Sequence, residues 1–141
     1  NNTMLQKALK LLDMKQPKDF HIAEVDGDFE IKIGEVTKDA GEYSYKSFLK
    51  AIQLCENKEV DAIVTMPINK EAWKKAGIDF KGHTDMLRDY FHKEAIMMLG
   101  TDEMFVALFT EHIPLKDVAS NIKKDKLIKF FLDFNHSIGD K

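Results

Sequence analysis

Polar residues of the kinds that enzymes use lie at the ends of two short apolar runs. Residues 62–66 form a β-branched run long enough for a buried strand, and Pro67 ends it because proline has no N–H for a sheet ladder. Lys70 follows closely. A second run, residues 104–109, leads into a polar turn that contains Glu111 and His112. Open α/β sheets bind ligands at the carboxyl ends of their strands, so this pattern predicts a site built from both turns.

Three residues in or near the first turn are candidates for substrate binding. Lys70 stands near a predicted helix start, where it could bind a phosphate or carboxylate or move a proton; a solvated lysine is the alternative. His83 and Thr84 follow Gly82 in a polar loop and offer an imidazole N–H and a hydroxyl to a polar, anionic ligand. The alternative for Thr84 is that it caps a helix beginning at Asp85.

His112 is the candidate metal ligand, because neutral imidazole binds zinc and similar divalent ions. A turn histidine that caps the following helix is the alternative. His136 lies in the predicted last helix and matches no metal motif, so we interpret it as a surface residue. His21 and His92 are interpreted in the same way.

Apolar periodicity and turn residues predict an α/β fold, with a partial parallel or mixed sheet flanked by helices. We expect a single α/β region over residues 1–141, with a helix and a possible β-hairpin in 1–40 and a core that carries the motifs in 41–141. The expected helices cover residues 3–14, 41–57, 70–76, 85–91 and 125–138, the last with Asp125 as its N-cap, and a further helix begins near Lys116. The expected strands cover residues 22–25 and 29–33 in the hairpin, and 62–66, 95–99 and 104–109 in the core.

Composition narrows the classes of protein that the chain can belong to. Its 141 residues suit one domain, with 44% apolar and 32% charged residues. A net charge of −3 argues against a nucleic-acid partner. The lone Cys55 excludes an internal disulfide, and we interpret it as a buried thiol on a helix face. No apolar run is long enough to span a membrane and no signal peptide is recognisable, so we expect a cytoplasmic protein.

Four ordered segments resemble the 4-hydroxythreonine-4-phosphate dehydrogenase family of pyridoxal phosphate biosynthesis. They are VTMPINK (64–70), AGIDFKGHTD (76–85), MMLGT (97–101) and VALFTEHIPLKDV (106–118). The resemblance implies the architecture of the isocitrate and isopropylmalate dehydrogenases. It also implies that a Gly-rich segment before this chain and the C-terminal half after it are missing, so we expect a fragment.

By the same resemblance, the full-length protein oxidises 4-phosphooxy-threonine with NAD and a divalent metal such as zinc, magnesium or cobalt. The product then loses carbon dioxide to give 3-amino-2-oxopropyl phosphate. His112 would be one metal ligand, His83 and Thr84 would bind the phosphorylated substrate, and Lys70 would be an anion or proton partner. NAD enters only through the resemblance, because the chain has no GxGxxG or P-loop. The family works as a homodimer with active sites shared between chains.

Two alternatives belong to other classes of protein. The chain by itself could be a non-catalytic folding or dimerisation module, because the family's other two metal histidines lie downstream of it. An acyltransferase of the phosphotransacetylase kind shares the broad architecture, although the Gly-His-Thr and His-Ile-Pro-Leu segments argue against it. For the isolated chain we expect no NAD reduction.

Overall fold

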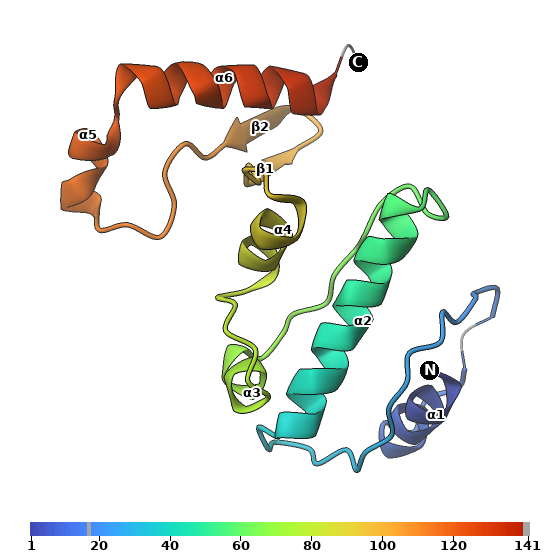
Figure 1. Ribbon diagram of the computed structural model, residues 1–141. Helices are drawn as coiled ribbons and strands as arrows, with labels where there is room; N and C mark the ends of the chain where they lie inside the picture. The colour runs from blue at the N-terminus through green and yellow to red at the C-terminus, as the bar shows by residue number, and fades with distance from the viewer. Residues whose placement is uncertain (17, 140–141) are drawn as a thin grey trace. The chain divides into compact units, whose positions relative to one another are not determined.

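A computed structural model describes residues 1–16 and 18–139 (Figure 1). Contacts between residues divide the chain into two compact units, Asn1–Gly82 and His83–Lys141. The boundary between the two units follows Gly82. Among the described residues, no helix is both long and apolar enough to cross a membrane.

The first unit contains the helices α1 (Asn2–Leu11), α2 (Lys38–Glu56) and α3 (Lys70–Lys75). Each begins at a side chain that accepts a hydrogen bond from the first helical turn, as expected for Asn and Thr N-caps. Asn69 performs this role for α3 by accepting from the backbone N–H of Ala72 at 2.9 Å. Gly77, with φ +78°, follows the end of α3 in the left-handed region that glycine adopts without strain. The three expected helices are therefore confirmed, with shifted ends.

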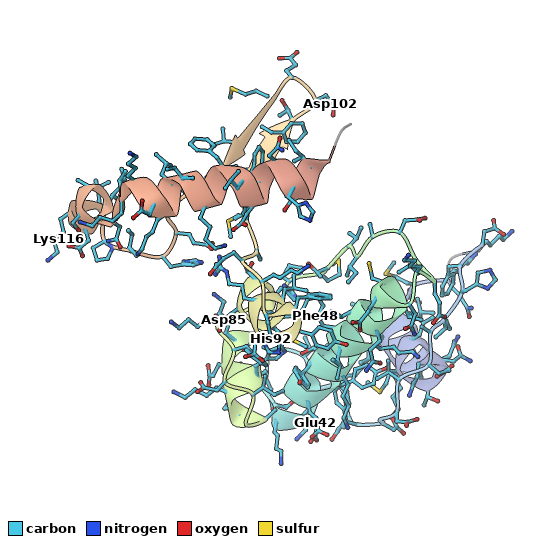
Figure 2. The ribbon with its side chains drawn as sticks, turned by 45° about the horizontal axis from the view of Figure 1, so that its top comes forward. Glu42, Phe48, Asp85, His92, Asp102 and Lys116 are labelled. Atoms are coloured by element: carbon cyan, nitrogen blue, oxygen red, sulfur yellow. The ribbon has the colours of Figure 1, made fainter. Side chains whose placement is uncertain are left out.

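The core of this unit lies where α2 packs against α3. Ile52 and Trp73 are fully buried, and Phe48 on α2, labelled in Figure 2, is 6% exposed. The Trp73 indole N–H donates to Ser44 Oγ at 2.8 Å, which satisfies its polar atom. A Cβ on Gly41 would lie 2.1 Å from the carbonyl oxygen of Ala72, so only glycine permits this close approach. Cys55, expected to be buried, is only partly so.

The expected β-hairpin in residues 22–33 does not form, since neither segment is a strand. Its backbone is held by other elements. The Asn1 side-chain amide donates to the carbonyls of Val25 (2.9 Å) and Gly27 (2.8 Å), and Lys7 pairs with Asp28. This segment is thus held by Asn1, the N-cap of α1, and by Lys7 on α1.

The expected strand at residues 62–66 is also absent. Val64 and Met66 are 96% and 80% exposed, so this run is not buried either. A strand forms only beside another strand that satisfies its N–H and C=O groups. Within the described residues, the first unit contains no strand that could pair with it.

The second unit contains α4 (His83–Phe91), β1 (Met98–Thr101), β2 (Met104–Ala107), a 3₁₀ turn (Leu115–Asp117), α5 (Val118–Asn121) and α6 (Lys124–Ile138). β1 and β2 pair antiparallel, with Met98 opposite Ala107, and Asp102 lies at the tip of the hairpin (Figure 2). The sheet is therefore neither parallel nor mixed. These strands were expected at residues 95–99 and 104–109 as buried strands of the core, whereas both are largely exposed.

Helix α6 contacts the chain that follows β2 through aromatic side chains. The rings of Phe109 and Phe130 meet edge to face with centroids 5.4 Å apart. The helix begins after Lys123 without a side-chain cap, so Asp125 is not its N-cap. The described residues as a whole form a helix-rich α/β structure with a small antiparallel sheet.

Candidate functional site

Lys70 is the first residue of α3, in the first unit. Its side chain is exposed, and its Cε lies 3.7 Å from the position that a Cβ on Gly82 would occupy. The Lys70 side chain thus extends along the loop that precedes His83. The neighbouring Asn69 is accounted for by its capping bond.

His83 and Thr84 are the first two residues of α4, in the second unit. Because the helix already begins at His83, Thr84 lies inside the first turn, and the alternative that it caps a helix starting at Asp85 is wrong. Both residues are half-buried. Burial lowers the pKa of the His83 imidazole from its ordinary value of 6.5, since burial disfavours the charged form. The neutral imidazole, with one donor and one acceptor, is thereby favoured.

His112 lies in the turn between β2 and the 3₁₀ segment, with its side chain 78% exposed. Its backbone has φ +55°, a left-handed conformation that is uncommon for residues other than glycine. The 3₁₀ turn and α5 that follow it have no side-chain cap, so the alternative that His112 caps the next helix is not supported. The imidazole is accessible and has no structural role in capping.

Arg88 on α4 connects this turn to the helix that carries His83 and Thr84. Its guanidinium pairs with the carboxylate of Glu111 through Nη2 and Oε1, and the same Nη2 donates to the carbonyl of Ala95 at 3.0 Å. Arg88 follows Thr84 by one helical turn, so both lie on the same face of α4. Glu111 directly precedes His112. The pair therefore fixes the His112 turn against the face of α4 that bears Thr84.

Two atoms of this pair have no hydrogen-bond partner within the described residues, although both are buried. They are Arg88 Nε and Glu111 Oε2. Glu94 Oε2 lies 3.6 Å from Arg88 Nε, and His112 Nε2 lies 4.0 Å from Glu111 Oε2, both too long for hydrogen bonds. A buried polar atom without a partner is costly and rare in proteins. Glu111 thus has a free acceptor next to the candidate metal ligand.

A cavity of about 370 Å³ opens beside the Arg88–Glu111 pair, within the second unit. Its lining contains as many basic as acidic side chains. Lys126, Lys129 and Asp133 among them belong to α6. None of the four expected site residues is part of its lining. The cavity does not, therefore, coincide with the site predicted from the sequence.

The residues around His112 supply part of a donor set for a divalent ion. Among residues 1–16 and 18–139, no three His, Cys, Asp or Glu side chains are grouped closely enough to hold a metal. His112 is accessible, and the neighbouring Glu111 has a free carboxylate oxygen. These two residues are chemically suited to bind a metal together with further ligands, but they do not form a complete site by themselves.

The structure brings part of the predicted site together. His83 and Thr84 share one helical turn, and the Arg88–Glu111 pair attaches the His112 turn to the same helix. Lys70 belongs to the other unit. Arg88 was missed by the motif reasoning. Two signals could have found it, because it is the chain's sole arginine in a lysine-rich sequence and lies one turn after Thr84.

Comparison with known proteins identifies the chain's relatives. The chain is 62% identical over 138 residues to a 4-hydroxythreonine-4-phosphate dehydrogenase of Sulfurimonas denitrificans. The match covers 98% of this chain and 45% of that protein. A dehydrogenase of the same name from Campylobacter fetus is 51% identical over 97% of the chain and 45% of its own length. The chain thus spans about half the length of these relatives.

A solved structure with a similar fold carries the same protein name. A crystal structure of a 4-hydroxythreonine-4-phosphate dehydrogenase from Burkholderia phymatum matches with a TM-score of 0.76 and 24% identity. The match covers 95% of this chain and 46% of that one. The family model described as pyridoxal phosphate biosynthetic protein PdxA matches residues 1–141. The chain therefore belongs to the PdxA family of pyridoxal phosphate biosynthetic proteins.

Proposed function

We propose that this chain is part of an oxidoreductase that oxidises 4-phosphooxy-threonine with NAD. The substrate hydroxyl loses its proton and a hydride passes to NAD⁺, which gives NADH and a β-keto acid. Loss of carbon dioxide from that acid gives 3-amino-2-oxopropyl phosphate. The family match over residues 1–141 carries this proposal, and the 62% identity to a protein named for this activity supports it.

Each expected site residue has a place in this scheme. His83 and Thr84 bind the polar part of the substrate from the first turn of α4, where burial favours a neutral imidazole. Lys70, exposed at the start of α3, pairs with an anionic group of the substrate or moves a proton. His112 is one ligand of a divalent metal, for which its accessible imidazole is suited. When bound, such an ion polarises the substrate's oxygen.

The proposal also includes a cofactor, a second subunit and an overall architecture. We propose NAD as the oxidant, although the chain has no Rossmann fingerprint. We also propose a homodimer with a shared active site and the isocitrate-dehydrogenase-like architecture. Exposed apolar side chains such as Phe105 (59%) and Leu132 (66%) in the second unit are compatible with burial in a larger assembly.

The same observations distinguish the dehydrogenase from the alternatives. The relatives described above are named dehydrogenases, which favours an oxidoreductase over an acyltransferase. A non-catalytic role for the chain by itself is favoured by the incomplete metal donor set within residues 1–16 and 18–139. Catalysis is therefore proposed for the protein at its native length.

The test is production of NADH from 4-phosphooxy-threonine by the protein at its native length. We expect turnover that is lost with a chelator and restored by zinc, magnesium or cobalt. His112→Ala should abolish turnover, and Thr84→Val should raise KM. His136→Ala, an exposed histidine on α6, is the matched control and should retain turnover. Turnover that is indifferent to the chelator and to His112→Ala would contradict the proposal.

A further inference from the structure

The carboxylate of Glu111 is held at one oxygen and free at the other. Its Oε1 is bound by the guanidinium of Arg88, and its side chain is only 16% exposed. Its Oε2 is buried and has no hydrogen-bond partner among the described residues. Nε2 of His112 lies 4.0 Å from this oxygen. One residue thus presents a fixed, unused acceptor to the adjacent histidine.

His112 can reach that acceptor by a small movement of its ring. At 78% exposure the imidazole is not confined by packing, so a side-chain rotation costs little. Glu111, by contrast, cannot turn away without breaking its bond to Arg88. The guanidinium in turn is anchored by its bond to the Ala95 carbonyl. The mobile partner is therefore the histidine, and the fixed partner is the carboxylate.

We propose that Arg88 and Glu111 are positioning residues for His112. Arg88 holds Glu111 so that Oε2 accepts a hydrogen bond from one ring N–H of His112, and the other ring nitrogen is then left to bind a divalent cation. Histidines that bind metals usually donate their second N–H to a carboxylate or carbonyl, which fixes the tautomer and the ring direction. This inference rests on the proposed metal role of His112.

Glu94 provides a matched control on the same arginine. Its Oε2 lies 3.6 Å from Arg88 Nε, but its side chain is 67% exposed and it is not adjacent to His112. Glu94→Gln and Glu111→Gln are the same chemical change at two carboxylates beside one guanidinium. Only the second removes the acceptor that faces His112.

The experiment measures Co²⁺ affinity by calorimetry, together with the absorption spectrum of the bound Co²⁺. It uses the protein at its native length. Removing a carboxylate that orients a metal-binding histidine typically costs 10- to 100-fold in affinity, so we expect a loss of about tenfold or more in Glu111→Gln. Arg88→Met should lose a similar amount with a changed spectrum, Arg88→Lys less, and Glu94→Gln should stay within about twofold. In a His112→Ala background, Glu111→Gln should cause no further loss.

Hydrogen exchange of residues 110–113 in the metal-free protein is the second measurement. It should accelerate in Arg88→Met and stay unchanged in Glu94→Gln. Exchange outside this segment should stay at the wild-type rate in each variant, which shows that the variants are folded. Wild-type affinity and spectrum in both Glu111→Gln and Arg88→Met, alongside a loss in His112→Ala, would overturn the positioning role and leave the proposed function intact. Unchanged affinity in His112→Ala would overturn the proposed metal role, and this inference with it.

Discussion

The α2–α3 contact in the first unit and the Arg88–Glu111 contact in the second hold chain segments in place by different physics. The first buries Ile52 and Trp73 completely and has no unsatisfied polar atom among those described. The second joins two charged side chains that are 32% and 16% exposed and leaves a buried oxygen free. Apolar burial is non-directional and stabilises the fold, whereas a charged, hydrogen-bonded pair is directional and holds its side chains in a defined geometry. We therefore expect stability to depend mostly on the first contact and function on the second.

The largest effect on stability is expected from Trp73→Ala. Removing this fully buried side chain leaves a cavity between α2 and α3 and removes the indole N–H that donates to Ser44 Oγ. Changes of this kind cost about 3–5 kcal/mol in the free energy of unfolding. Urea denaturation measures the loss. The exposed neighbour Lys74→Ala is the control, and an equal loss in both variants would break the contrast between buried and exposed positions.

Gly41→Ala should come next, because of the close approach between α2 and the Ala72 carbonyl. In an ordinary helix this change stabilises by about 0.5–1 kcal/mol. Here the new methyl has no room, so we expect a net destabilisation of about 1–3 kcal/mol. Gln53→Ala, at an exposed position of the same helix, should change stability little. Stabilisation by Gly41→Ala in thermal unfolding would show that the two helices can separate without cost.

Arg88→Met should have a smaller effect on stability. It leaves the largely buried Glu111 carboxylate without its cation. An unsatisfied buried polar group costs about 1–3 kcal/mol, and a fully buried charged one costs more. Partial exposure of Arg88 places the expected loss at the lower end. Glu94→Gln should be nearly neutral, since its contact is long and exposed. A loss as large as that of Trp73→Ala would indicate that the charged contact also stabilises the fold.

The smallest expected effect is a dependence of stability on pH that originates at His83. Its folded pKa is lowered by burial, so below about 6.5 the unfolded chain binds a proton that the folded chain resists. The contribution of His83 is therefore fully present above its unfolded pKa and is lost as the pH falls below it. His83→Gln should weaken the dependence of the unfolding midpoint on pH over this range, and His136→Gln should leave that dependence unchanged. An unchanged pH profile in His83→Gln would show that other groups cause the dependence.

The helices were predictable because their signals are local. The Asn69 cap bonds to Ala72 three residues later, and apolar side chains at helical spacing bury one face of α2. The strands were harder to predict. Residues 62–66 have the composition of a strand but no partner among the described residues, and β1 pairs antiparallel with β2 in a short hairpin. A strand's existence depends on its neighbour, which its own sequence does not specify.

The candidate site divides in the same way. The types and order of Lys70, His83, Thr84 and His112 were enough to resemble a family, and the comparisons confirm that family. Their roles stay predictions. Arg88 carried no motif of its own, because its importance comes from a contact with a residue 23 positions away.

By itself, then, the sequence determined the helices, the Asn69 cap, the family and the candidate residues, since these depend on neighbours within a turn or on ordered motifs. Only the tertiary structure decided that Arg88 holds Glu111 and that Glu111 presents a free oxygen beside His112. It also decided that Gly41 must be glycine. These features depend on where distant segments meet, and such meetings are set by packing and by the pairing of buried charges.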